Sequence, residues 1–426
     1  MTACHNVDTL LTRRCVTATP LFRQIECALN IPNFPSRRIE ADDGRSTLEQ
    51  IYRNLSLPSA VMQLELALEC DNAIAINQNL HRVEHGDVLI NNSPIQAANM
   101  LRMLRRAGLD KQVTIVRSDP GNRATGSTPT QIESILIDLG IPHLAYLIRQ
   151  IRLSLIDASA FSGVACQLNL PWLFISAELL RRRHSQNLTF LGRDGQLLSI
   201  LYDAYFGPAH YLPFSRRVAY AQPETAVAYL KAHSPDASVF IDISSTGATW
   251  AKLQSGIRIE ALIYCDLDFY TPERPNLPQG FSFLTRTSLC GQTNALLEVF
   301  NCGDHGYLSA VEINPGGWMR AEFEPLRVDS ALVQEIHTPA RLAANLAPIY
   351  RAPLLNELGR VPTDQLMTLF GVFCREICAK ALLSHDERLK PYFRDELTYK
   401  AFLQQAAGDP APHLRDASTQ ERIRAA

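Results

Sequence analysis

Residues 238–250, SVFIDISSTGATW, decide the expected fold of the second half of the chain. Three apolar, β-prone residues, 239–241, end at one acid, Asp242. Small residues follow at 244–249, and a segment with helical character begins after them. A strand, a small-residue turn and a helix start form a geometry that binds phosphate, because backbone N–H groups of such a turn point into one concavity. Gly247 lets an anion approach the backbone without a Cβ in the way.

A second unit of the same kind lies earlier in the chain. Residues 188–191 (LTFL) predict a strand, GRDG follows at 192–195, and residues 196–205 predict a helix. The two glycines permit close approach of a ligand to the backbone, and Arg193 supplies positive charge. The alternative is a plain turn between strand and helix, with an internal pair between Arg193 and Asp194.

The stretch 242–249 resembles the phosphoribosyl-pyrophosphate (PRPP) loop of type I phosphoribosyltransferases. That loop has an apolar strand, two acids, a short spacer and Thr-Gly-x-Thr; here 246–249 (TGAT) fits the ending and Asp242 fits the second acid. Ile241 replaces the first acid, and in the family the acid pair holds the ribose hydroxyls. The alternative is an ordinary tight turn, because a short string of this kind also occurs by chance.

The resemblance implies that different segments of the chain bind different parts of PRPP. The turn after Asp242 would take the 5-phosphate, and Asp242 would hold a ribose hydroxyl. The first turn, helped by a basic segment, would take the pyrophosphate, while Mg²⁺ would arrive with PRPP and meet Asp194 through water. The residues implied are Asp242, Arg193 and Asp194 as catalytic groups, and Gly192, Gly195, Arg216, Arg217, Ser244, Ser245, Thr246, Gly247, Ala248 and Thr249 as substrate-binding groups.

Three residues further along the chain are candidates for a base that accepts a proton from an acceptor hydroxyl. Glu298 lies in a predicted helix end, and Asp304 and His305 lie in a Gly-Asp-His-Gly loop. Carboxylates and imidazoles perform this chemistry. The alternative for each residue is an ordinary surface turn.

Near the N-terminus, residues 7–13 (VDTLLTR) resemble the first motif of haloacid-dehalogenase-type phosphatases. His5 stands where that motif has its nucleophilic aspartate, and histidine cannot form the aspartyl-phosphate. Three later positions depart from the family as well, where it has Ser-Asp, a lysine and Gly-Asp; here they hold Asn91 and Asn92, then Arg123, then residues 143–146 (HLAY). The resemblance therefore implies a dehalogenase-like fold without phosphatase chemistry. The alternative at 5–9 is a buried strand leading into an N-capped turn.

These patterns predict an α/β fold with two Rossmann-like parallel-sheet domains. Residues 1–150 form the dehalogenase-like domain, with a helical cap over about 15–85. Residues 151–329 form the phosphoribosyltransferase-like domain, and 330–426 form a helical C-terminal extension. Within the cap, Glu65 and Glu69 are spaced for one helix face, which we expect to be solvated. A helix break is expected near residues 169–171, where a proline interrupts the apolar pattern.

Composition excludes several classes of protein. The 426 residues are 46% hydrophobic with a net charge of −2, which argues for sizeable cores and against a general nucleic-acid binder. We see no long apolar run that spans a membrane and no signal-peptide core, and the ten cysteines show no C-x-x-C pair. We therefore expect a cytoplasmic protein with reduced thiols, either a monomer or a homodimer.

Three functions remain open at this point. The first is a PRPP-dependent transferase that moves 5-phosphoribose to a glycan or another small acceptor, as in the polysaccharide ribofuranosyltransferases that join these two domain types. The second is a catalytically degenerate pseudoenzyme that acts as a binding or assembly module. The third is a working phosphatase, which His5 and the missing acids disfavour. The sequence does not identify the acceptor.

Overall fold

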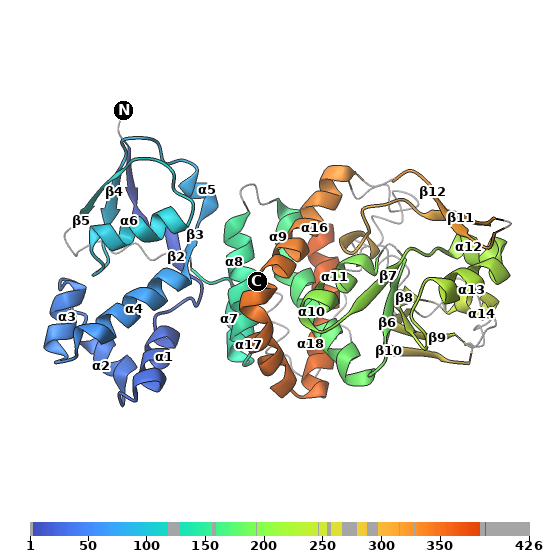
Figure 1. The fold of residues 1–426 in the computed structure, drawn as a ribbon, viewed down its shortest axis with the longest axis horizontal. Coiled ribbons are helices and arrows are strands. Elements are labelled where there is room, and N and C mark those ends of the chain that lie inside the picture. Colours follow the sequence, from blue (N-terminus) through green and yellow to red (C-terminus); the bar gives the residue numbers. More distant parts are fainter. Residues whose placement is uncertain are drawn as a thin grey trace. The chain divides into compact units, whose positions relative to one another are not determined.

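The computed structural model describes residues 3–117, 128–155, 159–192, 194–245, 247–253, 257–265, 279–287, 297–314, 316–326, 329–383 and 388. It has the α/β class expected from the sequence (Figure 1). The chain divides into two compact units, Met1–Ala158 and Ser159–Ala426. Each unit contains its own parallel sheet.

The first unit has a three-stranded parallel sheet in the order β1-β4-β5. Its strands are β1 (Cys4–Asn6), β4 (Val88–Asn91) and β5 (Thr114–Arg117). A 3-10 turn, Val7–Thr9, follows β1, and the side chain of Asn6 caps it by accepting from the Asp8 N–H at 3.1 Å. The N-capped turn is thus confirmed. The strand before it is not buried, because Cys4 is exposed and His5 is half-buried.

The first unit also contains a small antiparallel pair, β2 (Leu11–Arg13) and β3 (Ala73–Ala75), and a set of helices, of which α6 packs against β5. The segment expected to be a helical cap therefore contains a strand as well as helices. The boundary expected at residue 150 falls inside a helix, and the division comes after residue 158 instead. The helices are α1 (Thr19–Leu29), α2 (Phe34–Glu40), α3 (Leu48–Asn54), α4 (Ser59–Asn72), α5 (Asn77–Leu80), α6 (Ala97–Arg106), α7 (Gln131–Asp138) and α8 (Pro142–Ser154).

The first unit extends past residue 150 because polar contacts hold α8 within it. Arg149 and Arg152 both form ion pairs with Glu133 of α7, at 3.3 and 2.8 Å. Asn77 of α5 donates to the carbonyl of Ser154 at 3.0 Å. A domain cut at residue 150 would separate Arg152 from Glu133 and Ser154 from Asn77.

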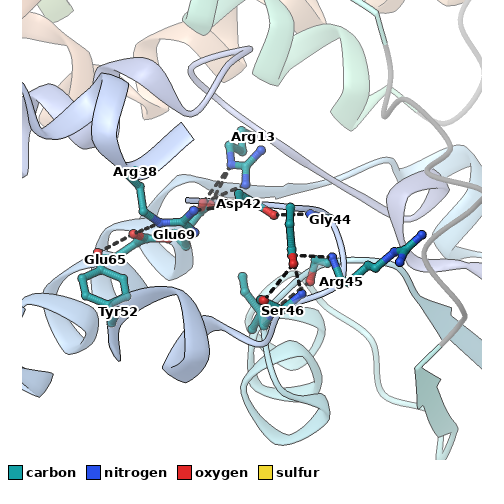
Figure 2. Close-up of polar contacts among 12 residues, drawn as sticks. Arg13, Arg38, Asp42, Gly44, Arg45, Ser46, Tyr52, Glu65 and Glu69 are labelled. Atoms are coloured by element: carbon teal, nitrogen blue, oxygen red, sulfur yellow. Dashed lines mark hydrogen bonds and ion pairs between the residues drawn. The ribbon is translucent and has the colours of Figure 1, made fainter. Parts of the chain in front are cut away.

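The expectation of a solvated face at Glu65 and Glu69 is wrong. Both side chains are buried, and each meets an arginine from another element (Figure 2). Arg38 of α2 binds Glu65 through two hydrogen bonds of 2.7 and 2.9 Å, and Arg13 of β2 binds Glu69. The Tyr52 hydroxyl also donates to Glu65. Two buried like charges are tolerated here because each has its own cation.

The second unit has a five-stranded parallel sheet in the order β10-β9-β8-β6-β7. The chain runs from β6 outward to β7 and then returns past β6 to β8, so the strand order reverses between β6 and β8. In open α/β sheets ligands bind beyond the carboxyl ends of the strands at such a reversal. The strands are β6 (Leu188–Leu191), β7 (Ala209–Leu212), β8 (Val239–Ser245), β9 (Arg258–Cys265) and β10 (Phe281–Thr287).

Figure 1 shows helices on both sides of this sheet, with α10 and α11 on one side and α12, α13 and α14 on the other. An apolar core fills the second side, built around Phe214, Val218, Trp250 and Ile259. A β-hairpin, β11 (Leu308–Ile313) with β12 (Met319–Phe323), packs on the same core. The helices are α10 (Leu170–Arg183), α11 (Gln196–Tyr205), α12 (Arg216–Ala221), α13 (Pro223–Ala232) and α14 (Ala248–Leu253).

The helix break expected near residues 169–171 does not occur. Helix α9 (Ala160–Val164) continues through a π-helical turn, Ala165–Asn169, into α10 (Leu170–Arg183). A π turn lets a helix continue past a proline, which has no N–H to donate. This run, 160–183, is long and apolar enough to cross a membrane by length and composition, and 83% of its apolar window is buried in the protein.

Residues 330–383 of the region expected to be a C-terminal extension belong to the helical layer of the second unit. It forms α16 (Ser330–Asn345), α17 (Ala347–Arg360) and α18 (Thr363–Leu383). Helix α16 packs against α11, and α18 packs against α10. The Tyr205 hydroxyl of α11 donates to the Ala343 carbonyl of α16 at 2.7 Å.

Candidate functional site

A cavity of about 330 Å³ lies beyond the carboxyl ends of β6 and β8, where the strand order reverses. Gly192 and Asp194 of the turn after β6 line it. Ser244, Ser245 and Thr249, from the end of β8 and the start of α14, line it as well. The structure thus brings together the two segments that the sequence singles out.

The segment after Asp242 differs in detail from the expected loop. Strand β8 continues to Ser245, so Ser244 and Ser245 are strand residues. The Ser245 hydroxyl accepts from the Gly247 N–H at 3.2 Å and is hydrogen-bonded to Asp242. Gly247 has a φ of +76°, which favours glycine. The Ser245 hydroxyl and the Gly247 N–H are therefore used in hydrogen bonds within the turn itself, because buried polar atoms require partners.

Two other residues expected in this turn lie outside the described part of the chain. These are Thr246 as a whole and the side chain of Ala248. Thr249 is described and lines the cavity. Among the described threonines of the motif, Thr249 is the one placed to offer a hydroxyl to a phosphate.

The two glycines of the first turn have different roles. Gly192 lines the cavity with a φ of +67°, and its N–H donates to the Leu212 carbonyl at 3.2 Å. Gly195 caps α11 and does not line the cavity. A Cβ on Gly195 would lie 2.6 Å from the Leu191 carbonyl oxygen, so its small size serves strand–helix packing. Arg193 lies outside the described residues.

Two adjacent arginines, both predicted to bind substrate, separate in the structure. Ser215 caps α12 by accepting from the Val218 N–H at 3.3 Å. Arg216 then lines the cavity, whereas Arg217 forms an ion pair with Glu324 and does not line it. The cavity therefore takes its described positive charge from Arg216.

Asp242 is half-buried at the cavity wall. Burial is the largest cause that raises the pKa of its carboxyl, and the nearby Glu298 carboxylate raises it as well. Hydrogen bonds from Trp250 and Ser245 and the charge of Arg216 lower it, and the net pKa is about 6. Asp242 consequently changes its charge close to neutral pH, which is a property of many functional carboxyls.

The candidate bases occupy different places. Glu298 lines the cavity and accepts from the Ser244 hydroxyl at 3.3 Å. His305 does not line it, and its Nε2 lies 2.6 Å from the Tyr211 hydroxyl, which also contacts the Gly192 carbonyl. Asp304 forms an ion pair with Arg341. Of the three candidate bases, Glu298 is therefore the one that lines the cavity.

The residues at the phosphatase-like positions of the first unit are engaged in local contacts. His5 Nε2 lies 3.0 Å from Asp87 Oδ2. N–H groups of Glu84 and Ala3 lower the pKa of Asp87. The Asn91 amide donates to the Ile95 carbonyl at 2.7 Å. The remaining positions are Asn92, which is buried, His143, which lies in α8, and Arg123, which lies outside the described residues.

Sequence reasoning missed several residues of the cavity wall. Phe214, Ser215, Trp250 and Tyr307 all line it. Trp250 follows the small-residue motif directly, and the signal that could have found it is that a buried indole N–H usually has a hydrogen-bond partner. Among the described residues, no cluster of three or more His, Cys, Asp or Glu side chains could hold a metal.

Comparison with known proteins adds no relative. No protein-family model matches this chain, and no curated protein matches it.

Proposed function

We propose that the protein is a PRPP-dependent phosphoribosyltransferase that moves 5-phosphoribose to a glycan or another small acceptor and releases pyrophosphate. One observation carries the proposal: the turn after β6 and the segment after Asp242 line one cavity at the reversal of the strand order. The cavity volume of about 330 Å³ lies at the small end of ligand pockets, which span roughly 300–1,000 Å³.

The same proposal assigns a doubly wound, Rossmann-like architecture to both units. The strand order of the second sheet, with its reversal between β6 and β8, is an order found in doubly wound sheets. For the first unit, a dehalogenase-like fold without phosphatase activity is proposed from the motif at residues 7–13 and from His5. Helices on both faces of the larger sheet support this assignment (Figure 1).

In this proposal each part of the donor meets a defined part of the cavity wall. Thr249, at the start of α14, offers its hydroxyl to the 5-phosphate. Asp242 accepts a hydrogen bond from a ribose hydroxyl. Gly192 and Arg216 hold the pyrophosphate, with Arg216 neutralising the charge that grows on it as it leaves.

The charges of the cavity define the form in which the donor binds. Asp194, Asp242 and Glu298 face it, and Arg216 is the described arginine in its wall. Free PRPP is strongly negative and would be repelled by three carboxyl groups. The magnesium complex of PRPP carries less charge, and Mg²⁺ bound to phosphates keeps waters through which Asp194 can contact it. We therefore assign the magnesium complex as the donor.

The reaction breaks the bond between the anomeric carbon and the pyrophosphate oxygen and forms a bond from that carbon to an acceptor oxygen. The acceptor hydroxyl gives its proton to Glu298, which faces the cavity. The pyrophosphate leaves with the electron pair of the broken bond. An ionised Asp242 stabilises the positive charge that develops on the ribose ring.

Titration calorimetry with PRPP and Mg²⁺ tests the proposal. The wild-type protein is expected to bind the complex, and Asp242→Asn is expected to bind it at least about tenfold more weakly, as loss of a hydrogen bond to a charged group implies. A wild-type protein that gives no heat at millimolar PRPP would contradict the proposal. Hydrolysis of a generic phosphate ester that His5→Ala abolishes would instead revive a phosphatase function for the first unit.

The second candidate function is a pseudoenzyme that binds or assembles without catalysis. Two observations favour it. Ile241 stands where the family has an acid, and the N–H of Gly247 already donates to the Ser245 hydroxyl. In this case PRPP binds and no pyrophosphate is released with any acceptor, water included. An assay of pyrophosphate release at saturating PRPP separates the two functions.

A further inference from the structure

The indole of Trp250 connects the acid of the candidate site to its surroundings. Trp250 is 3% exposed. Its single N–H points between two oxygens, at 3.1 Å from Oδ2 of Asp242 and 3.1 Å from Oγ of Ser245. Because a buried indole N–H requires an acceptor, this shared hydrogen bond restricts the rotation of both side chains.

The same ring reaches the segment that carries Arg216. Trp250 and Phe214 stack with their centroids 5.3 Å apart and their planes 13° apart. Ser215, which caps α12, and Arg216 follow Phe214 directly, and all of these residues line the cavity. One side chain therefore contacts the end of β8 and packs against the residue that leads into α12.

We propose that Trp250 is the positioning residue of this site: its indole N–H orients the Asp242 carboxylate, and its ring fixes the Phe214–Arg216 segment opposite that carboxylate. The inference rests on the proposed function for the identity of the ligand. The link between Trp250 and Asp242 is a property of the ligand-free protein and is testable without PRPP.

The electrostatics of the cavity give the inference a measurable consequence. Burial and the Glu298 carboxylate disfavour ionised Asp242, whereas the Trp250 N–H, the Ser245 hydroxyl and Arg216 favour it. Asp194 also faces the cavity from the turn after β6. Removing the indole N–H leaves the disfavouring groups in place, so Asp242 becomes harder to ionise.

The first experiment uses Trp250→Phe, which keeps an aromatic ring beside Phe214 and removes the N–H. The pKa of Asp242 is measured by carbon NMR of its carboxyl in the ligand-free, full-length protein. We expect it to rise by about one unit above that of the wild type, the size typical of one lost hydrogen bond to a charged group. Trp318→Phe is the matched control, because Trp318 is 79% exposed and does not line the cavity.

An unchanged pKa of Asp242 in folded Trp250→Phe overturns the proposal. If Trp250→Phe does not fold, biosynthetic replacement of tryptophan by its benzothiophene analogue removes the N–H while keeping the size of the ring. The replacement is made in a Trp172→Phe, Trp318→Phe background, in which Trp250 is the one tryptophan left in the sequence. The expected result is again a raised pKa of Asp242.

The second experiment connects the positioning role to the ligand. The dissociation constant of the magnesium complex of PRPP is measured against pH for the wild type, Trp250→Phe, Asp242→Asn and the double variant. We expect Trp250→Phe to weaken binding and to move its pH dependence upward, and to add little in the Asp242→Asn background, because both act through one carboxylate. Full additivity contradicts the positioning role. Absence of PRPP binding by the wild type contradicts the proposed function, while the NMR result still decides the role of Trp250.

Discussion

Arg216 lines the candidate cavity, while Arg217, the next residue in the chain, points elsewhere and forms an ion pair with Glu324. The two residues begin a short helix, in which neighbouring side chains leave the axis about 100° apart. The helix cap at Ser215, which fixes the start of α12, therefore decides which arginine faces the cavity.

This separation gives a matched pair of variants. Arg216→Ala is expected to weaken binding of the magnesium complex of PRPP by about tenfold or more, because hydrogen bonds to charged groups contribute about 1.5–3 kcal/mol. Arg217→Ala removes the same charge from a position outside the cavity, and we expect a change of less than about threefold. Calorimetry at constant ionic strength measures both. Equal losses in the two variants would show that net charge, and not position, governs binding.

The raised pKa of Asp242 predicts a stability effect with a defined sign. Folding raises this pKa from 3.8 to about 6, so the folded protein retains a proton between these pH values that the unfolded chain has lost. The cost of ionised Asp242 is therefore absent below about pH 4 and complete above about pH 6. We expect Asp242→Asn to raise the free energy of unfolding by about 1–3 kcal/mol at pH 8 and to have little effect at pH 4.

Urea denaturation at the two pH values measures this difference. A stabilisation of Asp242→Asn that is equal at pH 4 and pH 8 would mean that ionisation of Asp242 is not its cause. A variant that is more stable and binds PRPP less well would show that the site retains Asp242 at a cost to folding.

Gly195 is expected to matter for the fold and not for the ligand. A Cβ at this position would meet the Leu191 carbonyl oxygen at 2.6 Å, so Gly195→Ala must shift α11 or β6. We expect a loss of about 1–3 kcal/mol in the free energy of unfolding, as overpacking typically costs. Gly359→Ala is the control, because its added Cβ meets nothing within 4 Å inside α17 and should stabilise that helix slightly. Comparable stability of the two variants would contradict this assignment.

The buried ion pairs of the first unit give a prediction that is independent of the candidate site. Glu65→Gln leaves Arg38 buried at 3% exposure, with Asp42 at 3.6 Å as its remaining charged partner among the described residues (Figure 2). Removing one member of a buried pair typically costs about 3–5 kcal/mol. Asp110→Asn, in an exposed pair with Lys111, should change stability by less than about 1 kcal/mol. Thermal unfolding of the two variants is the measurement, and a small loss in Glu65→Gln would show that the network is dispensable.

Local periodicity predicted the elements around the candidate site well. Strand β6 and helix α11 have the predicted limits, because apolar β-branched and aromatic residues and then a helical apolar pattern follow one another without ambiguity. Strand β8 extends further than the sequence predicts, because Ser244 and Ser245 pair with β9. That pairing is a tertiary contact, which local sequence does not show. The composition of these two residues alone indicates a loop.

Long-range partners account for what the sequence could not show. In the sequence, the spacing of Glu65 and Glu69 is that of a solvated helix face. Their partners, Arg38 and Arg13, come from other elements and cover them in the folded protein. The ion-pair partner of Arg217, Glu324, likewise lies far along the chain. Charged side chains at helical spacing carry no information about which distant partner covers them.

The central claim is that the turn after β6 and the segment after Asp242 both bind one PRPP molecule. A crystal structure of the protein with PRPP and Mg²⁺ tests it most directly. The account predicts electron density for the 5-phosphate beside Thr249, for the ribose beside Asp242, and for the pyrophosphate between Gly192 and Arg216. An empty cavity at saturating PRPP, or PRPP bound at another surface, would contradict the account.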